Sequence, residues 1–137
     1  MDRTPLDKWI ASKIFGDSPG RRLSQADVNR HQLAKLRETI EYARLKSPFY
    51  RGQLAEFPTN RLKDFEDLQQ FPFTSPEHLQ ERGPEFLCVS QSEIERVVTL
   101  DVPGANTKSR RLYFTEEDVE LTVDFFHHGM STLVAPG

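Results

Sequence analysis

Residues Arg96–Phe114 read RVVTLDVPGANTKSRRLYF, and this stretch decides how the second half of the chain folds. β-Branched and aromatic residues recur at both of its ends, so Arg96–Leu100 and Arg111–Phe114 are predicted to be short strands. The nine residues Val102–Arg110 lie between them, whereas most hairpin loops need only about two to five residues. Long loops in compact proteins are usually functional or mobile. We therefore predict a β-hairpin whose loop holds, or once held, a ligand.

The composition is that of an ordinary folded protein. The chain has 137 residues, of which 36% are hydrophobic and 28% charged, and its net charge is −3. A mildly acidic balance argues against general nucleic-acid binding, which usually needs a basic face. No apolar run approaches the ~20 residues that span a bilayer, and no signal-peptide core precedes Leu6. We expect a cytoplasmic protein with neither a membrane nor a nucleic-acid partner.

Helical patterns dominate the first third of the chain. Apolar residues recur at helical spacing over Leu6–Phe15, which predicts a first helix. Ser24 with Asp27 three residues later resembles a helix N-cap, and we expect a long helix from there to about Leu45. Pro48 ends that helix, because the residue before proline avoids the α conformation, and it can open a short helix of its own.

A proline-rich region of short segments follows. Asp64–Leu68 is predicted to form one or two helical turns, and Thr74–Leu79 to form a short capped helix. Phe86–Val89 could be a brief strand. Within it, Cys88 is the single cysteine, so an internal disulfide is excluded, and we interpret it as a small buried hydrophobic residue.

The final helix should begin at Thr115, because a hydroxyl cap followed by three acids suits a helix N-terminus. Its apolar residues fall into two rows, Val119, Val123, Phe126, Met130 and Leu133 in one and Leu121, Phe125 and Thr132 in the other. Two rows exceed what a surface helix shows, so this helix should be covered on more than one side. Since little sequence follows it, we expect the chain to be cut short. We also expect the isolated chain to self-associate, burying Phe125, Phe126 and Met130.

These segments predict a mostly helical α+β fold: a long N-terminal helix, several short helices, a small β-hairpin and a C-terminal amphipathic helix. We expect a single partial domain over residues 1–137. Its subregions are an N-terminal arm (1–20), a helical region (21–95) and the hairpin with the last helix (96–137).

A family resemblance rests on an ordered set of short motifs, namely Tyr42-Ala43-Arg44, Ser47–Arg51, Asp67-Leu68, Phe71–Thr74 and Arg96–Thr99. From about Leu33 to its end, the chain resembles the N-terminal portion of phenylacetate–CoA ligase-like enzymes, members of the adenylate-forming superfamily. The resemblance implies ATP-dependent activation of a carboxylic acid to an acyl-adenylate, followed by transfer to coenzyme A. ATP, Mg and CoA are therefore the ligands implied for a full-length member of the family.

The signature loop of that family has the form T-S-G-T-T-G-x-P-K. Aligned without gaps, Gly104 falls on the first glycine and Arg110 on the lysine, so these two residues are the candidate cofactor-binding residues. The rest of the loop departs from the pattern. Pro103 has no backbone N–H, Ala105 lacks a hydroxyl, and Thr107 places a Cβ where the family has glycine. We predict a degenerate phosphate loop, because each lost donor to a charged group is worth about 1.5–3 kcal/mol.

By the resemblance, the adenine-contacting segments, the magnesium-ligating acid and the domain with the catalytic lysine lie further along the ligase chain. We therefore predict no catalytic residue in these 137 residues and no tight cofactor binding. His127 and His128 near Asp124 provide too few ligands for a metal site, so we predict none. A stand-alone binding or regulatory module with a repurposed loop remains the alternative.

Overall fold

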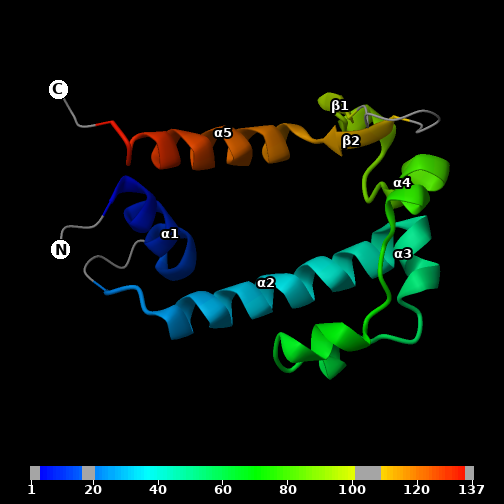
Figure 1. Ribbon diagram of the computed structural model, residues 1–137, viewed down its shortest axis with the longest axis horizontal. Helices are drawn as coiled ribbons and strands as arrows, with labels where there is room; N and C mark the ends of the chain where they lie inside the picture. The colour runs from blue at the N-terminus through cyan, green and yellow to red at the C-terminus, as the bar shows by residue number, and fades with distance from the viewer. Residues whose placement is uncertain (1–3, 17–20, 101–108, 135–137) are drawn as a thin grey trace. The chain divides into compact units, whose positions relative to one another are not determined.

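The computed structural model describes residues 4–16, 21–100 and 109–134. In chain order (Figure 1), its elements are α1 (Pro5–Phe15), α2 (Gln25–Lys46), α3 (Pro48–Gln53), the 3-10 turns η1 (Thr59–Arg61) and η2 (Glu66–Gln70), α4 (Pro76–Arg82), the 3-10 turns η3 (Gly83–Phe86) and η4 (Gln91–Glu93), β1 (Arg96–Leu100), β2 (Arg110–Phe114) and α5 (Glu116–Met130). A mostly helical chain with one small antiparallel sheet is what the sequence predicted. The chain divides into two compact units, one of Met1–Gln32 with Glu117–Gly137 and one of Leu33–Glu116.

In the first unit, α1 has well-defined ends. Thr4 caps its N-terminus: the hydroxyl accepts from the Asp7 N–H at 3.1 Å, and the Asp7 carboxylate accepts from the Thr4 N–H at 3.1 Å. This reciprocal capping box satisfies donors that the first turn leaves open. Gly16 ends the helix at φ 62°, a conformation that favours glycine, and its N–H donates to the Ser12 carbonyl at 2.9 Å.

Trp9 joins α1 to α5 within this unit. Its indole Nε1–H donates to Asp124 Oδ2 at 2.6 Å, and its ring meets Phe125 edge-on with 5.6 Å between centroids. Lys13 Nζ lies 3.3 Å from the same carboxylate oxygen. Among the described residues of this unit, Ala11 is the one buried hydrophobic side chain. The packing of α1 on α5 therefore depends largely on one aromatic ring and one carboxylate.

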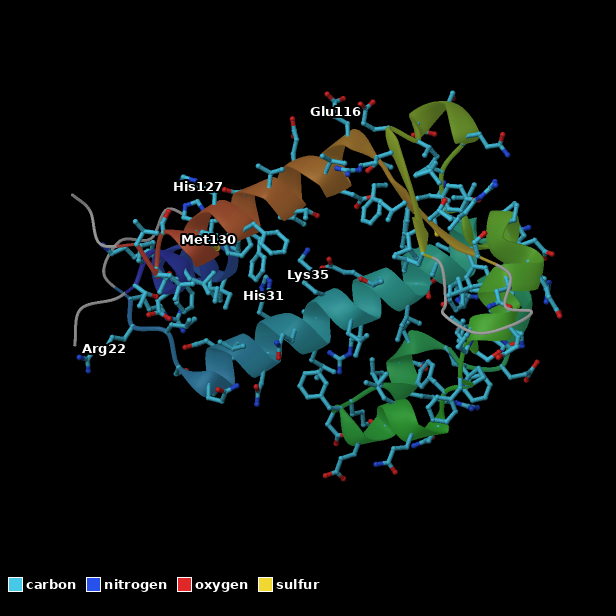
Figure 2. All side chains as sticks on the ribbon, turned by 45° about the horizontal axis from the view of Figure 1, so that its top comes forward. Arg22, His31, Lys35, Glu116, His127 and Met130 are labelled. Carbon is cyan, nitrogen blue, oxygen red and sulfur yellow. The ribbon has the colours of Figure 1, made fainter. Side chains whose placement is uncertain are left out.

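Asp27 organises the first turn of α2. Its side chain is buried, with 8% exposure, and accepts from the Ser24 hydroxyl at 2.5 Å. Arg21 and Arg30 approach the other carboxylate oxygen at 3.1 and 3.3 Å. The bond from Ser24, supported by these two guanidinium groups, lowers the pKa of Asp27. Figure 2 shows the next turns of the helix, where His31 and Lys35 project from the same side, as a spacing of four residues requires.

The second unit holds most of the fully buried side chains of the described chain. Phe49 is 2% exposed and stacks on Phe86 with 4.0 Å between ring centroids, while Leu62 is wholly buried. Ser47 is also fully buried: its hydroxyl caps α3 by accepting from the Tyr50 N–H and donates to the Glu85 carbonyl at 2.8 Å. The helix break predicted at Pro48 is confirmed, and Phe49 directly after it packs into the core.

The strand predicted at Phe86–Val89 is not formed. Phe86 is the last residue of the 3-10 turn η3, and the backbone leaves that turn at Leu87 without a strand partner among the described residues. The next segment to pair is β1. It forms an antiparallel ladder with β2, in which Arg96 lies opposite Phe114 and Leu100 opposite Arg110. In the described parts of the chain, no helix is long and apolar enough to cross a membrane.

Candidate functional site

The hairpin holds the two ends of the predicted ligand loop side by side. The last ladder pair is Leu100 with Arg110, so the candidate Arg110 is the first residue of β2. The other candidate, Gly104, lies outside the described residues, as does the whole of 101–108. The ladder thus brings Leu100 and Arg110, which flank this segment in the sequence, opposite each other.

A groove of about 250 Å³ lies on one face of β2, where α4 packs against the strand and η3 adds residues to the lining. Figure 1 shows α4 next to the hairpin. The residues that line the groove are Leu79, Gln80, Gly83, Pro84, Ser109, Arg111 and Tyr113. Those from the hairpin alternate along the strand, because every second side chain points to the same face.

Hydrogen-bond donors dominate the polar lining of this groove. Arg111 brings a guanidinium group, Ser109 and Tyr113 bring hydroxyls, and Gln80 brings a side-chain amide. Leu79 and Pro84 form an apolar wall beside them. None of the described lining residues is an acid.

Sequence reasoning singled out the loop and missed this groove. The alternation of Arg111 and Tyr113 could have shown that two polar side chains share one face of the predicted strand, whereas Ser109 was assigned to the loop. The contribution of Gln80 could not have been found in that way, because only the packing of α4 on β2 brings it there.

A second, wider groove of about 740 Å³ runs from Tyr42 and Lys46 of α2 to the segment that includes Cys88 and ends at Glu93. The Tyr42 hydroxyl donates to the Cys88 carbonyl at 3.4 Å. Burial raises the pKa of the Cys88 thiol, which keeps it protonated and unreactive. Hydrogen bonds from Ser90 lower the pKa of Glu93, so this acid is already used locally to cap η4. Neither Cys88 nor Glu93 is therefore a reactive group of this groove.

The pair His127–His128 lies in the last turns of α5, with Met130 (Figure 2). His128 Nδ1 lies 3.3 Å from Asp124 Oδ1. The hydrogen bond from the Trp9 indole, with a smaller contribution from Lys13, lowers the pKa of the Asp124 carboxyl. The Asp124 carboxylate of α5 is therefore already bonded to side chains of α1. Within the described ranges, no group of three potential metal ligands comes together.

No protein-family model matches the sequence. The curated proteins contain no match either.

Solved structures of 2-hydroxyisobutyryl-CoA ligase do match, over 84% of this chain. One shows that ligase in an open conformation with 2-HIB-AMP and CoA; its TM-score is 0.72, the sequence identity 22%, and the match covers 28% of that chain. Another, with 2-HIB-AMP and CoA in the thioesterification state, gives a TM-score of 0.73 at 23% identity over 26% of its chain.

The present chain therefore spans only about a quarter of the length of the ligases that it matches. An identity below 25% relates folds and does not transfer activity. The resemblance predicted from the sequence is confirmed at that level: this chain has the fold of part of an adenylate-forming CoA ligase.

Proposed function

We propose that this chain is the N-terminal portion of an ATP-dependent carboxylic acid–CoA ligase. One observation carries the proposal: 84% of the chain superposes on 2-hydroxyisobutyryl-CoA ligase with TM-scores of 0.72 and 0.73. The order of motifs along the sequence, from Tyr42 to Thr99, points to the same family independently of the structure. In this role the chain provides a helical scaffold and the hairpin that presents the loop.

The reaction of such a ligase has two steps. The substrate carboxylate attacks the α-phosphate of ATP, which forms an acyl-adenylate and releases pyrophosphate. The thiol of CoA then attacks the acyl carbon, which forms the thioester and releases AMP. Gly104 and Arg110 would meet the phosphates in this scheme, and Mg would be bound by acids elsewhere in the ligase. The chain by itself would then form no acyl-adenylate.

The loop sequence supports weak phosphate binding. Pro103 removes a backbone donor and Ala105 a hydroxyl, and each lost bond to a charged phosphate weakens binding by about 1.5–3 kcal/mol. Lys108 and Arg110 retain positive charge. Charge alone attracts an anion but does not position it, since positioning depends on fixed backbone donors.

The exposed apolar surface supports a role within a larger assembly. In the described residues only four hydrophobic side chains are buried, whereas α5 exposes Phe125, Phe126 and Met130 at 43, 61 and 56%. Exposed apolar surface of this kind marks an interaction face. We propose that the remainder of the ligase covers it, and that the isolated chain self-associates through it.

The DNA that follows the codon for Gly137 tests the proposal directly. A reading frame that continues with ligase-like sequence is the expected result. A stop codon in an expressed gene would overturn the proposal and favour the stand-alone module.

A biochemical test uses the chain itself. Incubated with ATP, Mg and a panel of carboxylic acids, it should exchange no pyrophosphate into ATP. A matched variant restores the family loop through V102T, P103S, A105T, N106T, T107G, S109P and R110K. Calorimetry should detect markedly tighter ATP binding after this restoration than before it. Exchange by the unmodified chain would show that it is a complete enzyme and contradict the proposal.

A further inference from the structure

The groove between β2 and α4 has a composition suited to a small anion. Every described polar side chain that lines it can donate a hydrogen bond, and Arg111 adds a permanent positive charge. An acid in the lining would repel an anion, and none of the described lining residues is acidic. Its volume of about 250 Å³ exceeds several times the roughly 30 Å³ that a water molecule occupies in the liquid. A phosphate or carboxylate group therefore fits with part of its hydration.

The charge of Arg111 is available to a ligand. None of the salt bridges found among the described residues includes it, in contrast to Arg21, Arg30, Arg44 and Arg82, each of which pairs with an acid. On β1 its partner in the ladder is Thr99, which is neutral. An arginine next to two hydroxyls and an amide, with no described acid paired to it, is a typical arrangement for oxyanion recognition.

Three of the four residues that supply these donors belong to regular elements. Arg111 and Tyr113 lie in the middle of a five-residue ladder, so their spacing along β2 is set by the strand. Gln80 belongs to α4, whose first turn is fixed by a capping box in which the Ser75 hydroxyl accepts from the His78 N–H. Side chains on regular elements are held more rigidly than side chains on loops, which favours a preformed site.

From these observations we propose that Arg111, Ser109, Tyr113 and Gln80 form a binding site for a phosphate-type oxyanion. The site belongs to the face of β2 and to α4; Ser109 is the one residue that it takes from the predicted loop Val102–Arg110, and it does not need Val102–Lys108. It also does not rest on the proposed ligase activity, so either hypothesis can fail without the other. The guanidinium fork would bind two oxygens of the anion, with the hydroxyls and the amide on the remaining ones.

Calorimetry on the full chain tests this site with inorganic phosphate, pyrophosphate and acetate as separate probes. At about 0.1 M sodium chloride, which screens loose surface attraction, phosphate or pyrophosphate should bind with a Kd in the range of about 0.1–5 mM. Tighter binding of acetate would identify a carboxylate site and overturn the phosphate assignment. The absence of heat with all three probes would overturn the site itself.

Two substitutions and a control locate the binding. Arg111→Gln should weaken phosphate binding by about tenfold or more, because a charge-assisted bond is lost. Tyr113→Phe, which removes one hydroxyl, should weaken it by about threefold to tenfold. The control is Arg96→Gln, which makes the same change of charge in the same hairpin but outside the groove lining. This substitution should change the Kd for phosphate by no more than about twofold. Equal losses for Arg96→Gln and Arg111→Gln would mean general charge attraction and contradict the proposal.

Backbone amide NMR distinguishes this groove from the loop even if a variant folds poorly. Phosphate added to the unmodified chain should shift the amide signals of Gln80, Arg111 and Tyr113. Shifts confined to residues 102–108 would place the anion in the loop and overturn the proposal.

Discussion

Each of the two compact units of this chain is stabilised by a different kind of internal contact. In the unit Leu33–Glu116, aromatic and aliphatic side chains around Phe49 and Leu62 exclude water. In the unit that contains α1 and α5, the described contacts centre on Trp9 and the carboxylate of Asp124. Large apolar side chains of α5 remain exposed there. The unit Leu33–Glu116 therefore has a hydrophobic core of its own, whereas the other unit buries few of its described apolar side chains.

The largest expected effect is in the well-packed unit. Phe49→Ala removes a ring that is 2% exposed and stacked on Phe86. It should lower the free energy of unfolding by about 3–5 kcal/mol, measured by urea denaturation. Phe73→Ala is the matched control, because that ring is 89% exposed, and it should change stability by no more than about 0.5 kcal/mol. If the two variants lost equal stability, the contrast between core and surface in this unit would be wrong.

A smaller, local effect is expected in the other unit. Trp9→Phe keeps an aromatic ring but removes the indole N–H that donates to Asp124 at 2.6 Å. Amide hydrogen exchange in α1 and α5 should become about threefold to tenfold faster, because one hydrogen bond between them is lost. Exchange in α3 should stay unchanged. Faster exchange in α3 as well would show that the two units unfold together, which would remove the basis of the comparison.

The smallest effect is a dependence on pH at the start of α2. Hydrogen bonds from Ser24 and two nearby arginines hold the pKa of Asp27 below its ordinary value of 3.8. The folded state therefore favours the ionised form. Its stabilising effect is complete above the unfolded pKa and is lost as the pH falls through the lower, folded pKa.

We expect the first turn of α2 to fray below about pH 4, followed by the NMR signals of the Ser24 and Asp27 amides. Asp27→Asn should start from a frayed turn and show little further change with pH. The same acid transition in both proteins would mean that another group is responsible.

Local signals in the sequence account for much of what the structure contains. A serine before a helical pattern indicated the cap on Asp27, and the alternation of β-branched residues indicated the paired strands β1 and β2. The cap and the alternation within each strand depend on neighbours within about four residues, so the sequence carries them directly. Taken together, these local signals predicted the mostly helical α+β class.

Features that depend on distant residues could not be predicted in the same way. Phe86–Val89 has the composition of a strand, yet a strand needs a partner, and Phe86 instead stacks on Phe49. The bond from Trp9 to Asp124 joins positions 115 residues apart, and no spacing rule connects them. The groove on β2 also depends on α4, which is placed there by packing alone.

The last rung of the ladder, Leu100 with Arg110, has a consequence for engineering. Because this rung fastens both ends of the intervening segment, doubling the length of the segment should cost only about 0.6 kcal/mol in closure entropy. Foreign peptides could be inserted at this place while the strands keep their register. The hairpin is therefore a natural point for displaying an epitope or a reporter sequence.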